Sequence, residues 1–106
     1  MEYNYLEISQ INNYIKNLID KDYFLNKVYV KGEISNFKNH ARGHLYFTLK
    51  DDNSRINAVM FASSAKTLDF IPGDGNQVLI EGRISCYPAS GSYQIYVETM
   101  TLDGIG

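Results

Sequence analysis

With 106 residues, 44% of them hydrophobic and 21% charged, the chain is long enough for one compact soluble domain and too short for two. Its formal net charge of −2 excludes a protein that holds nucleic acid by overall positive charge alone. The single Cys86 excludes an internal disulfide, no apolar run reaches membrane length, and the start Met1-Glu2-Tyr3-Asn4 is unlike a signal peptide. We therefore predict a cytoplasmic protein without membrane contact.

The first predicted element is an amphipathic helix with Ser9 as its expected N-cap. Its apolar positions recur at i, i+3, i+4, i+7 and i+8, namely Ile11, Tyr14, Ile15, Leu18 and Ile19. Asp20-Lys21-Asp22 ends the helix. An apolar helical stripe usually belongs to a core, so residues 1–26 are predicted to pack as a helical segment on the domain formed by residues 27–106.

Three strands are predicted next, over residues 27–36, 44–50 and 55–61, because apolar side chains alternate with polar, aromatic and basic ones. A basic loop, Lys38-Asn-His-Ala-Arg-Gly-His44, separates the first two strands, and the polar turn 51–54 separates the second from the third. The inward positions are Leu45, Phe47, Leu49, Ile56, Ala58 and Met60, and the outward positions are His44, Tyr46, Thr48, Lys50, Arg55, Asn57, Val59 and Phe61.

The remaining predicted elements, from residue 62 onward, are one short helix and two strands. A short helix over residues 62–70 precedes a turn at 72–76, a strand at 77–87, a hairpin turn at 88–91 and a last strand at 92–101. Gly32 and Gly82 interrupt the first and fourth strands, where we expect the bulges or sharp bends that close a small barrel. Three strands, a helix and two strands in this order predict a mainly β, five-stranded OB-fold barrel with an additional N-terminal helix.

Charge is distributed unevenly along the chain. Between Lys27 and Arg55 there are six cations and three anions, a local charge of +3, whereas the rest carries four cations and nine anions, a local charge of −5. One basic region on an otherwise acidic protein indicates a localised anion site.

Several motifs resemble one family. They are Val30-Lys31-Gly32-Glu33-Ile34-Ser35-Asn36-Phe37, Gly43-His44-Leu45-Tyr46-Phe47-Thr48-Leu49-Lys50-Asp51, Val59-Met60-Phe61, Gly82-Arg83-Ile84-Ser85 and Asp103-Gly104-Ile105-Gly106. From residue 9 to the end, the chain resembles the N-terminal domain of the exodeoxyribonuclease VII large subunit. The resemblance implies a substrate-binding OB-fold domain of an enzyme that degrades single-stranded DNA to oligonucleotides. It also implies that the catalytic region, on which the small subunits dock, lies beyond residue 106, so this chain alone would not hydrolyse DNA.

Stacking on aromatic rings combined with backbone cations is how OB folds hold single strands, and it needs no base sequence. The candidate nucleic-acid-binding residues are Phe37, Lys38, His40, Arg42 and His44 in or beside the first loop, with Tyr46, Lys50, Arg55 and Phe61 on strands two and three. Tyr87 and Tyr93 flank the loop between the last two strands, and Asn36 and Asn57 are within reach of base edges.

Three other interpretations address parts of the sequence. A metal-dependent nuclease site around Asp51 and Asp52 is disfavoured, because polar residues suit a tight turn and the two histidines lie at the opposite end of the strand. We predict no catalytic residue, metal or cofactor here. An oligosaccharide-binding OB fold would not need the basic loop. The main rival is a protein-interaction module that docks on the enzyme body or another subunit, which exposure of Ile11, Tyr14 or Leu18 would support.

Overall fold

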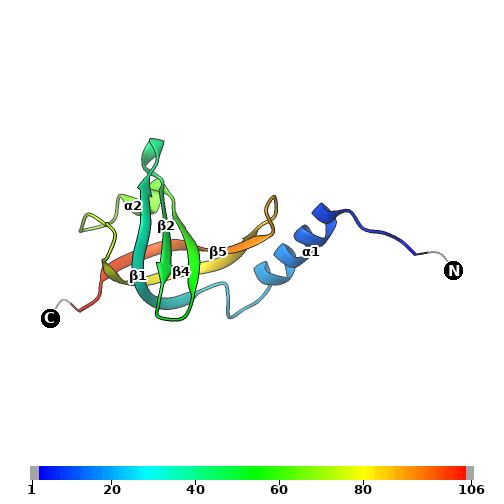
Figure 1. Ribbon diagram of the computed structural model, residues 1–106, viewed down its shortest axis with the longest axis horizontal. Coiled ribbons are helices and arrows are strands. Elements are labelled where there is room, and N and C mark those ends of the chain that lie inside the picture. Colours follow the sequence, from blue (N-terminus) through cyan, green and yellow to red (C-terminus); the bar gives the residue numbers. More distant parts are fainter. Residues whose placement is uncertain (1–2, 105–106) are drawn as a thin grey trace.

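The computed structural model describes residues 3–104, in which five strands close into a barrel and one helix projects from its side (Figure 1). The elements are α1 (Ile8–Asp20), β1 (Val28–Asn39), the 3-10 turn η1 (Ala41–Gly43), β2 (Leu45–Lys50), β3 (Arg55–Met60), α2 (Ala62–Ala65), β4 (Gln77–Tyr87) and β5 (Ser92–Leu102). Around the barrel the order is β1-β2-β3-β5-β4. The predicted mainly β five-stranded barrel with two helices is confirmed. Met1, Glu2, Ile105 and Gly106, which the predicted segments and the last motif include, lie outside the described residues.

The barrel interior holds the side chains that alternation placed there. Leu45, Phe47 and Leu49 of β2 are buried, as are Ala58 and Met60 of β3. They join Ile34, Val78, Ile80, Ile95, Val97 and Met100 from the other strands in one apolar core. Because the opposite side chains of β2 and β3 point outward, the barrel presents a continuous outer face built from these strands.

Strand β1 pairs with two neighbours, β2 and β4. Glu33 pairs with Gln77 of β4 and with Lys50 of β2, so the strand changes partner next to Gly32. The bulge expected at Gly32 lies further along, between Ser35 and Lys38. Gly32 instead permits a close approach, since a Cβ there would lie 2.9 Å from the Lys50 carbonyl oxygen.

Gly82 lies at an irregularity in pairing, as predicted. The register between β4 and β5 shifts between Glu81 and Gly82. A Cβ on Gly82 would lie only 2.5 Å from the Tyr96 carbonyl oxygen. The absence of a side chain therefore lets the two strands cross closely where the barrel bends.

Helix α1 differs from its prediction in two respects. Its N-cap is Glu7 and not Ser9, because the Gln10 side chain accepts a hydrogen bond from the Glu7 N–H at 2.7 Å to complete a capping box. None of its side chains is buried. The helix touches the barrel beside the β4–β5 hairpin, where Asn12 Nδ2 donates to the Pro88 carbonyl oxygen at 2.9 Å. Its apolar stripe, expected to lie on the core, faces solvent, with Tyr14 and Leu18 exposed.

Two further element boundaries differ from the prediction. The helix expected over residues 62–70 is the single turn α2, and the segment after it is irregular. β1 continues to Asn39, so Phe37 and Lys38 lie on a strand and the loop between β1 and β2 is shorter than expected. Within the described residues, no helix is long and apolar enough to cross a membrane.

Candidate nucleic-acid interface

The outer face of the barrel carries one row of side chains that crosses all five strands. Cross-strand pairing connects Lys38 to Tyr46, Tyr46 to Val59, Val59 to Tyr96, and Tyr96 to Arg83. Directly paired residues on neighbouring strands project from the same face of a sheet. This outer row, as we call these five residues, therefore has a cation at each end and two tyrosines inside it. Val59, predicted outward, is nevertheless only 5% exposed because a tyrosine is paired with it on each side.

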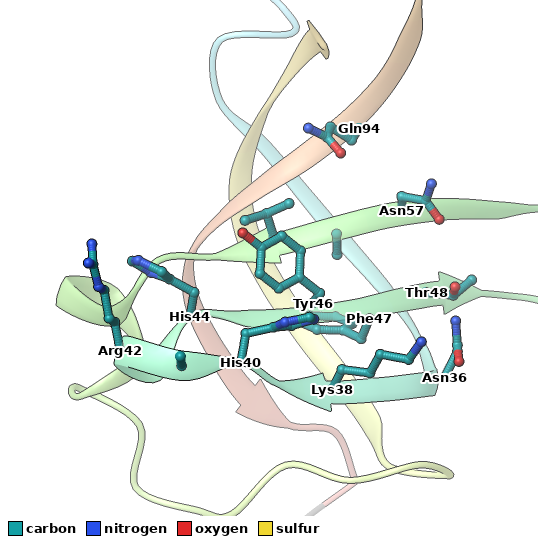
Figure 2. A pocket seen from close by; sticks show the side chains of 13 residues that line it. Asn36, Lys38, His40, Arg42, His44, Tyr46, Phe47, Thr48, Asn57 and Gln94 are labelled. Atoms are coloured by element: carbon teal, nitrogen blue, oxygen red, sulfur yellow. The ribbon is translucent and has the colours of Figure 1, made fainter. Parts of the chain in front are cut away.

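One end of the outer row borders an open cavity of about 670 Å³ between the β1–β2 loop and the strands β2 and β3 (Figure 2). Five of the nine predicted binding residues line it: Lys38, His40, Arg42, His44 and Tyr46. Polar side chains of four strands close its other end, namely Asn36, Thr48, Asn57 and Gln94. The cavity thus joins cations, an aromatic ring and neutral hydrogen-bonding groups, which are the partners that phosphates, base faces and base edges require.

The Tyr46 ring is held in place by the loop. His40 meets it edge-on, with 4.6 Å between the ring centroids and 79° between their planes. Tyr46 remains 38% exposed, and Figure 2 shows it beside His40 within the cavity. A fixed, partly exposed ring is a surface on which a base can stack without first losing side-chain freedom.

The basic loop is a tight turn closed by its own backbone. The His40 N–H donates to the His44 carbonyl oxygen at 2.9 Å, and the Gly43 N–H donates to that of His40 at 3.1 Å. Arg42 and Gly43 both adopt positive φ, of 71° and 83°. Arg42 thus occupies a conformation that non-glycine residues rarely adopt, within the turn that these two hydrogen bonds close.

His44 fastens the loop to the rest of the barrel. Its Nδ1 accepts a hydrogen bond from the Ala62 N–H at 3.0 Å, so the histidine caps the first turn of α2. The His44 ring also meets Phe61 edge-on, with centroids 5.5 Å apart. The His44 side chain also lines the cavity.

The other four predicted residues lie outside this cavity. Phe37 packs toward the core, with its ring centroid 6.3 Å from that of Phe47. Lys50 forms an ion pair with Glu33 at 3.6 Å. Phe61 lies between His44 and Tyr96.

Arg55 lines a second cavity, of about 320 Å³, together with Asn57 and Tyr93 from the side of the β4–β5 hairpin. Asn57 lines both cavities, so the two are adjacent. Tyr93, expected beside the loop between the last two strands, thus lies next to Arg55 and Asn57.

Sequence reasoning placed Thr48 on the outer face without naming it as a binding candidate, and it missed Gln94, Tyr96 and Arg83 as members of this face. Gln94 and Tyr96 alternate with the buried Ile95 and Val97, which is a signal that the sequence does contain. Their alignment with β2 and β3 depends on the parallel pairing of β3 with β5, which alternation within one strand cannot supply.

The acidic turn has a structural function. Asp51 Oδ1 accepts hydrogen bonds from the N–H groups of Asn53 and Ser54, each at 2.8 Å. These bonds favour the ionised carboxylate and hold the pKa of Asp51 below its ordinary value. Across residues 3–104, no group of three or more His, Cys, Asp or Glu side chains is placed to hold a metal ion.

Comparison with known proteins agrees with this geometry. Residues 6–101 match a family described as the OB-fold nucleic acid binding domain. All 106 residues are 57% identical to the exodeoxyribonuclease 7 large subunits of Bacillus thuringiensis (strain Al Hakam) and Bacillus cereus (strain AH820). In both, the matched part is 24% of the relative, so the chain spans about a quarter of their length.

Two solved structures share the fold at low sequence identity. A replication protein A heterotrimer bound to ssDNA gives a TM-score of 0.59 at 14% identity, over 74% of this chain and 57% of that one. The asparaginyl-tRNA synthetase from Pyrococcus horikoshii gives 0.60 at 18% identity, over 86% of this chain and 22% of that one. At these identities the likeness concerns the barrel itself.

Proposed function

The chain belongs to the family of OB-fold nucleic acid binding domains, and we propose that it is the single-stranded-DNA-binding domain of an exodeoxyribonuclease VII large subunit. The observation that carries the proposal is the Lys38 end of the outer row, where Tyr46 lies between Lys38 and the loop that bears Arg42. The whole enzyme would degrade single-stranded DNA to oligonucleotides in the cytoplasm. The present domain would hold the substrate, and the catalytic steps would belong to the other three quarters of the subunit.

The chemistry of the cavity favours a single strand over a duplex. A base can stack on Tyr46 only if its own face is free, and the amides of Asn57 and Gln94 can meet a base edge only if that edge is unpaired. Lys38 and Arg42 supply charge to phosphates on either side of the ring. Because stacking and phosphate contact do not depend on base identity, such a site suits an enzyme that degrades any sequence.

The test is fluorescence anisotropy of a labelled oligo-dT with this domain at two salt concentrations, with unlabelled duplex DNA as competitor. We expect binding that weakens as salt rises and that the duplex displaces poorly. Absence of binding at low salt, or equal competition by duplex, would refute the proposal.

The exposed stripe of α1 supports a second role, docking on the remainder of the large subunit, to which the small subunits would attach. Tyr14 is 66% exposed and Leu18 56% exposed on a helix that otherwise touches the barrel mainly at β4. An exposed apolar helical face commonly marks a surface that contacts another protein body. The relatives supply such a body, since this chain corresponds to 24% of their length.

Comparing the isolated domain with the complete large subunit tests the docking role. Leu18→Ser should lower the unfolding temperature of the complete large subunit and leave that of the isolated domain nearly unchanged, because Leu18 is already solvated there. Asn17→Ser, on the polar side of the same helix, is the control. An equal effect of Leu18→Ser on both proteins would contradict docking.

A further inference from the structure

We propose that the nucleic-acid path continues from the main cavity across β5 to a second binding site at Arg83 on β4. This inference rests on the proposed function. It adds contacts between the bound DNA and protein residues that lie outside the main cavity. The second site consists of Phe61, Tyr96 and Arg83, which we call the Tyr96 cluster. Its ligand is the same single strand, held there by one phosphate on Arg83 and by a base on Phe61.

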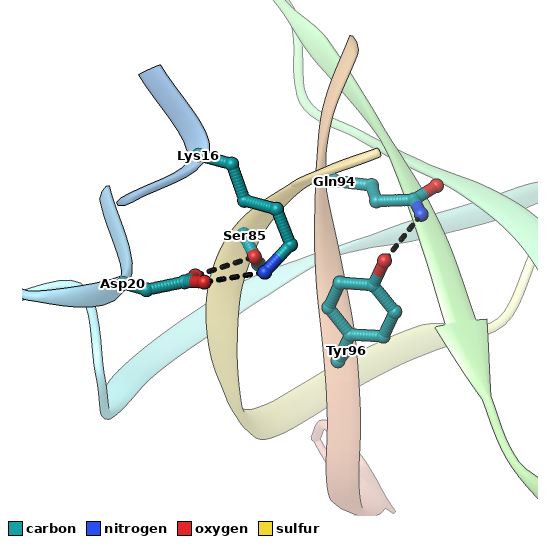
Figure 3. Close-up of polar contacts among 5 residues, drawn as sticks. All are labelled: Lys16, Asp20, Ser85, Gln94 and Tyr96. Carbon is teal, nitrogen blue, oxygen red and sulfur yellow. Dashed lines mark hydrogen bonds and ion pairs between the residues drawn. The ribbon is translucent and has the colours of Figure 1, made fainter. Parts of the chain in front are cut away.

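The Tyr96 cluster is organised around one ring. The Arg83 Cζ atom lies 4.7 Å from the centroid of the Tyr96 ring, so the guanidinium is held over it by a cation–π contact. Phe61 stacks with Tyr96, with centroids 6.0 Å apart and planes 24° apart. The Tyr96 hydroxyl accepts a hydrogen bond from Gln94 Nε2 at 2.8 Å, drawn in Figure 3. Tyr96 is half-buried and positions the other two, whereas Phe61 is 45% exposed and Arg83 is exposed.

The Arg83 guanidinium is available to a phosphate. Three ion pairs occur in the described part of the chain, and Arg83 is in none of them. The Asp20 carboxylate already accepts hydrogen bonds from Lys16 Nζ and Ser85 Oγ, each at 2.6 Å, which lower the pKa of Asp20, and the positive charge of Arg83 contributes to the same lowering (Figure 3). Glu81, near the same end of β4, is paired with Lys27 at 3.6 Å.

The neighbouring side chains give the path a direction. Along β5, exposed Glu98 lies two residues beyond Tyr96, and Gln94 lies two residues before it and lines the main cavity. A polyanion is therefore disfavoured on the Glu98 side and favoured on the Gln94 side. The strand would leave the cavity past Gln94, cross Tyr96 and end at Arg83.

Strand spacing shows that one nucleotide cannot fill both sites. Tyr46 on β2 and Arg83 on β4 are separated by three strand-to-strand steps, about 14 Å at roughly 4.8 Å a step. At about 3.4 Å or more per nucleotide, an oligonucleotide of about two residues should occupy the main cavity alone, whereas one of about 12 should engage both sites, within the range that OB folds bind. Dependence on length is thus the property that separates the second site from the first.

The experiment compares labelled dT oligonucleotides of about two and about 12 residues on the wild type and on Arg83→Gln. Loss of one exposed phosphate contact should weaken the longer oligonucleotide about 3–5-fold and reduce the slope of log K against log salt by about 0.7, with the shorter one unaffected. Lys31→Gln is the control, because it removes an exposed cation of β1 that lines neither the main cavity nor the Tyr96 cluster.

Variants of Tyr96 test its positioning role separately. Tyr96→Leu should weaken binding of the longer oligonucleotide as much as Arg83→Gln does. Tyr96→Phe should bind it as tightly as the wild type, because the ring under the guanidinium is kept. Thermal unfolding of each variant checks that the barrel is intact.

The outcomes distinguish this inference from the proposed function. If the wild type binds the longer oligonucleotide and Arg83→Gln binds it equally well with the same salt slope, the second site is refuted and the first stands. An equal loss for both lengths would also refute it. If the wild type binds neither oligonucleotide, both proposals fail.

Discussion

Replacing Tyr46 with leucine tests the centre of the proposed interface. The ring is paired across the sheet with Lys38 and Val59 and is met edge-on by His40 at 4.6 Å. Leucine is apolar and keeps Val59 covered, so the main loss to the folded protein is the aromatic contact with His40. We expect the free energy of unfolding to fall by about 0.5–1.5 kcal/mol. The barrel should remain folded.

The effect of Tyr46→Leu on binding should be larger. A base stacked on an aromatic side chain contributes about 1–3 kcal/mol, so the dissociation constant for oligo-dT should rise about 5–150-fold. The tyrosine carries no charge, so the slope of log K against log salt should not change. Anisotropy titrations at several salt concentrations measure both quantities. Tyr29→Leu is the matched control, since Tyr29 is an exposed tyrosine of β1 that lies outside the main cavity.

A folded Tyr46→Leu protein that binds oligo-dT as tightly as the wild type would show that no base stacks on this ring. A changed salt slope would show that the substitution disturbs the basic loop through His40, and the reasoning from stacking would again be wrong.

Three further predictions concern charge, close packing and pH. Lys38→Gln should weaken oligo-dT binding and reduce the salt slope by about 0.7, measured in the same titrations, and an unchanged slope would remove Lys38 from the phosphate path. Gly82→Ala should lower the free energy of unfolding in urea by about 1–3 kcal/mol, because its Cβ would lie 2.5 Å from a backbone oxygen, whereas Gly73→Ala, with no atom within 4 Å, should be neutral or slightly stabilising. Hydrogen bonds hold the pKa of Asp20 below its ordinary value, so its contribution is present at neutral pH and is lost as pH falls through the folded-state pKa. Asp20→Asn should therefore lower stability at pH 7, by less than about 1 kcal/mol, and the difference should disappear in strong acid. A difference that persists there would contradict this account.

Much of the barrel could be predicted because alternation and turn chemistry act locally. The alternation of Leu45, Phe47 and Leu49 with polar residues placed β2 correctly, since a strand with one buried face has a period of two. The N-cap of α1 could not be predicted correctly from residue type alone. Ser9 is the stronger capping residue by type, yet Glu7 and Gln10 form a reciprocal pair that starts the helix at Ile8.

Helix α1 shows the limit of a pattern that reports only amphipathicity. The spacing of Ile11, Ile15 and Leu18 predicts that one face will be covered, and it contains no information about which surface covers it. In this domain the barrel covers little of that face, although the pattern itself was identified correctly. The mistake lay in assuming that the barrel covers this face.

The candidate interface was half predictable for a related reason. Lys38, His40, Arg42, His44 and Tyr46 are close in sequence, so a basic loop followed by an outward ring could be recognised within one segment. Joining that segment to Tyr96 and Arg83 requires the pairing of β3 with β5, two strands separated by α2, β4 and two turns. Register between such distant strands is determined by barrel closure, because shifting one strand by a single residue would turn its buried side chains outward. The outer row is therefore a property of the closed barrel, and we expect that a strand of DNA following it makes contacts that no continuous stretch of this sequence contains.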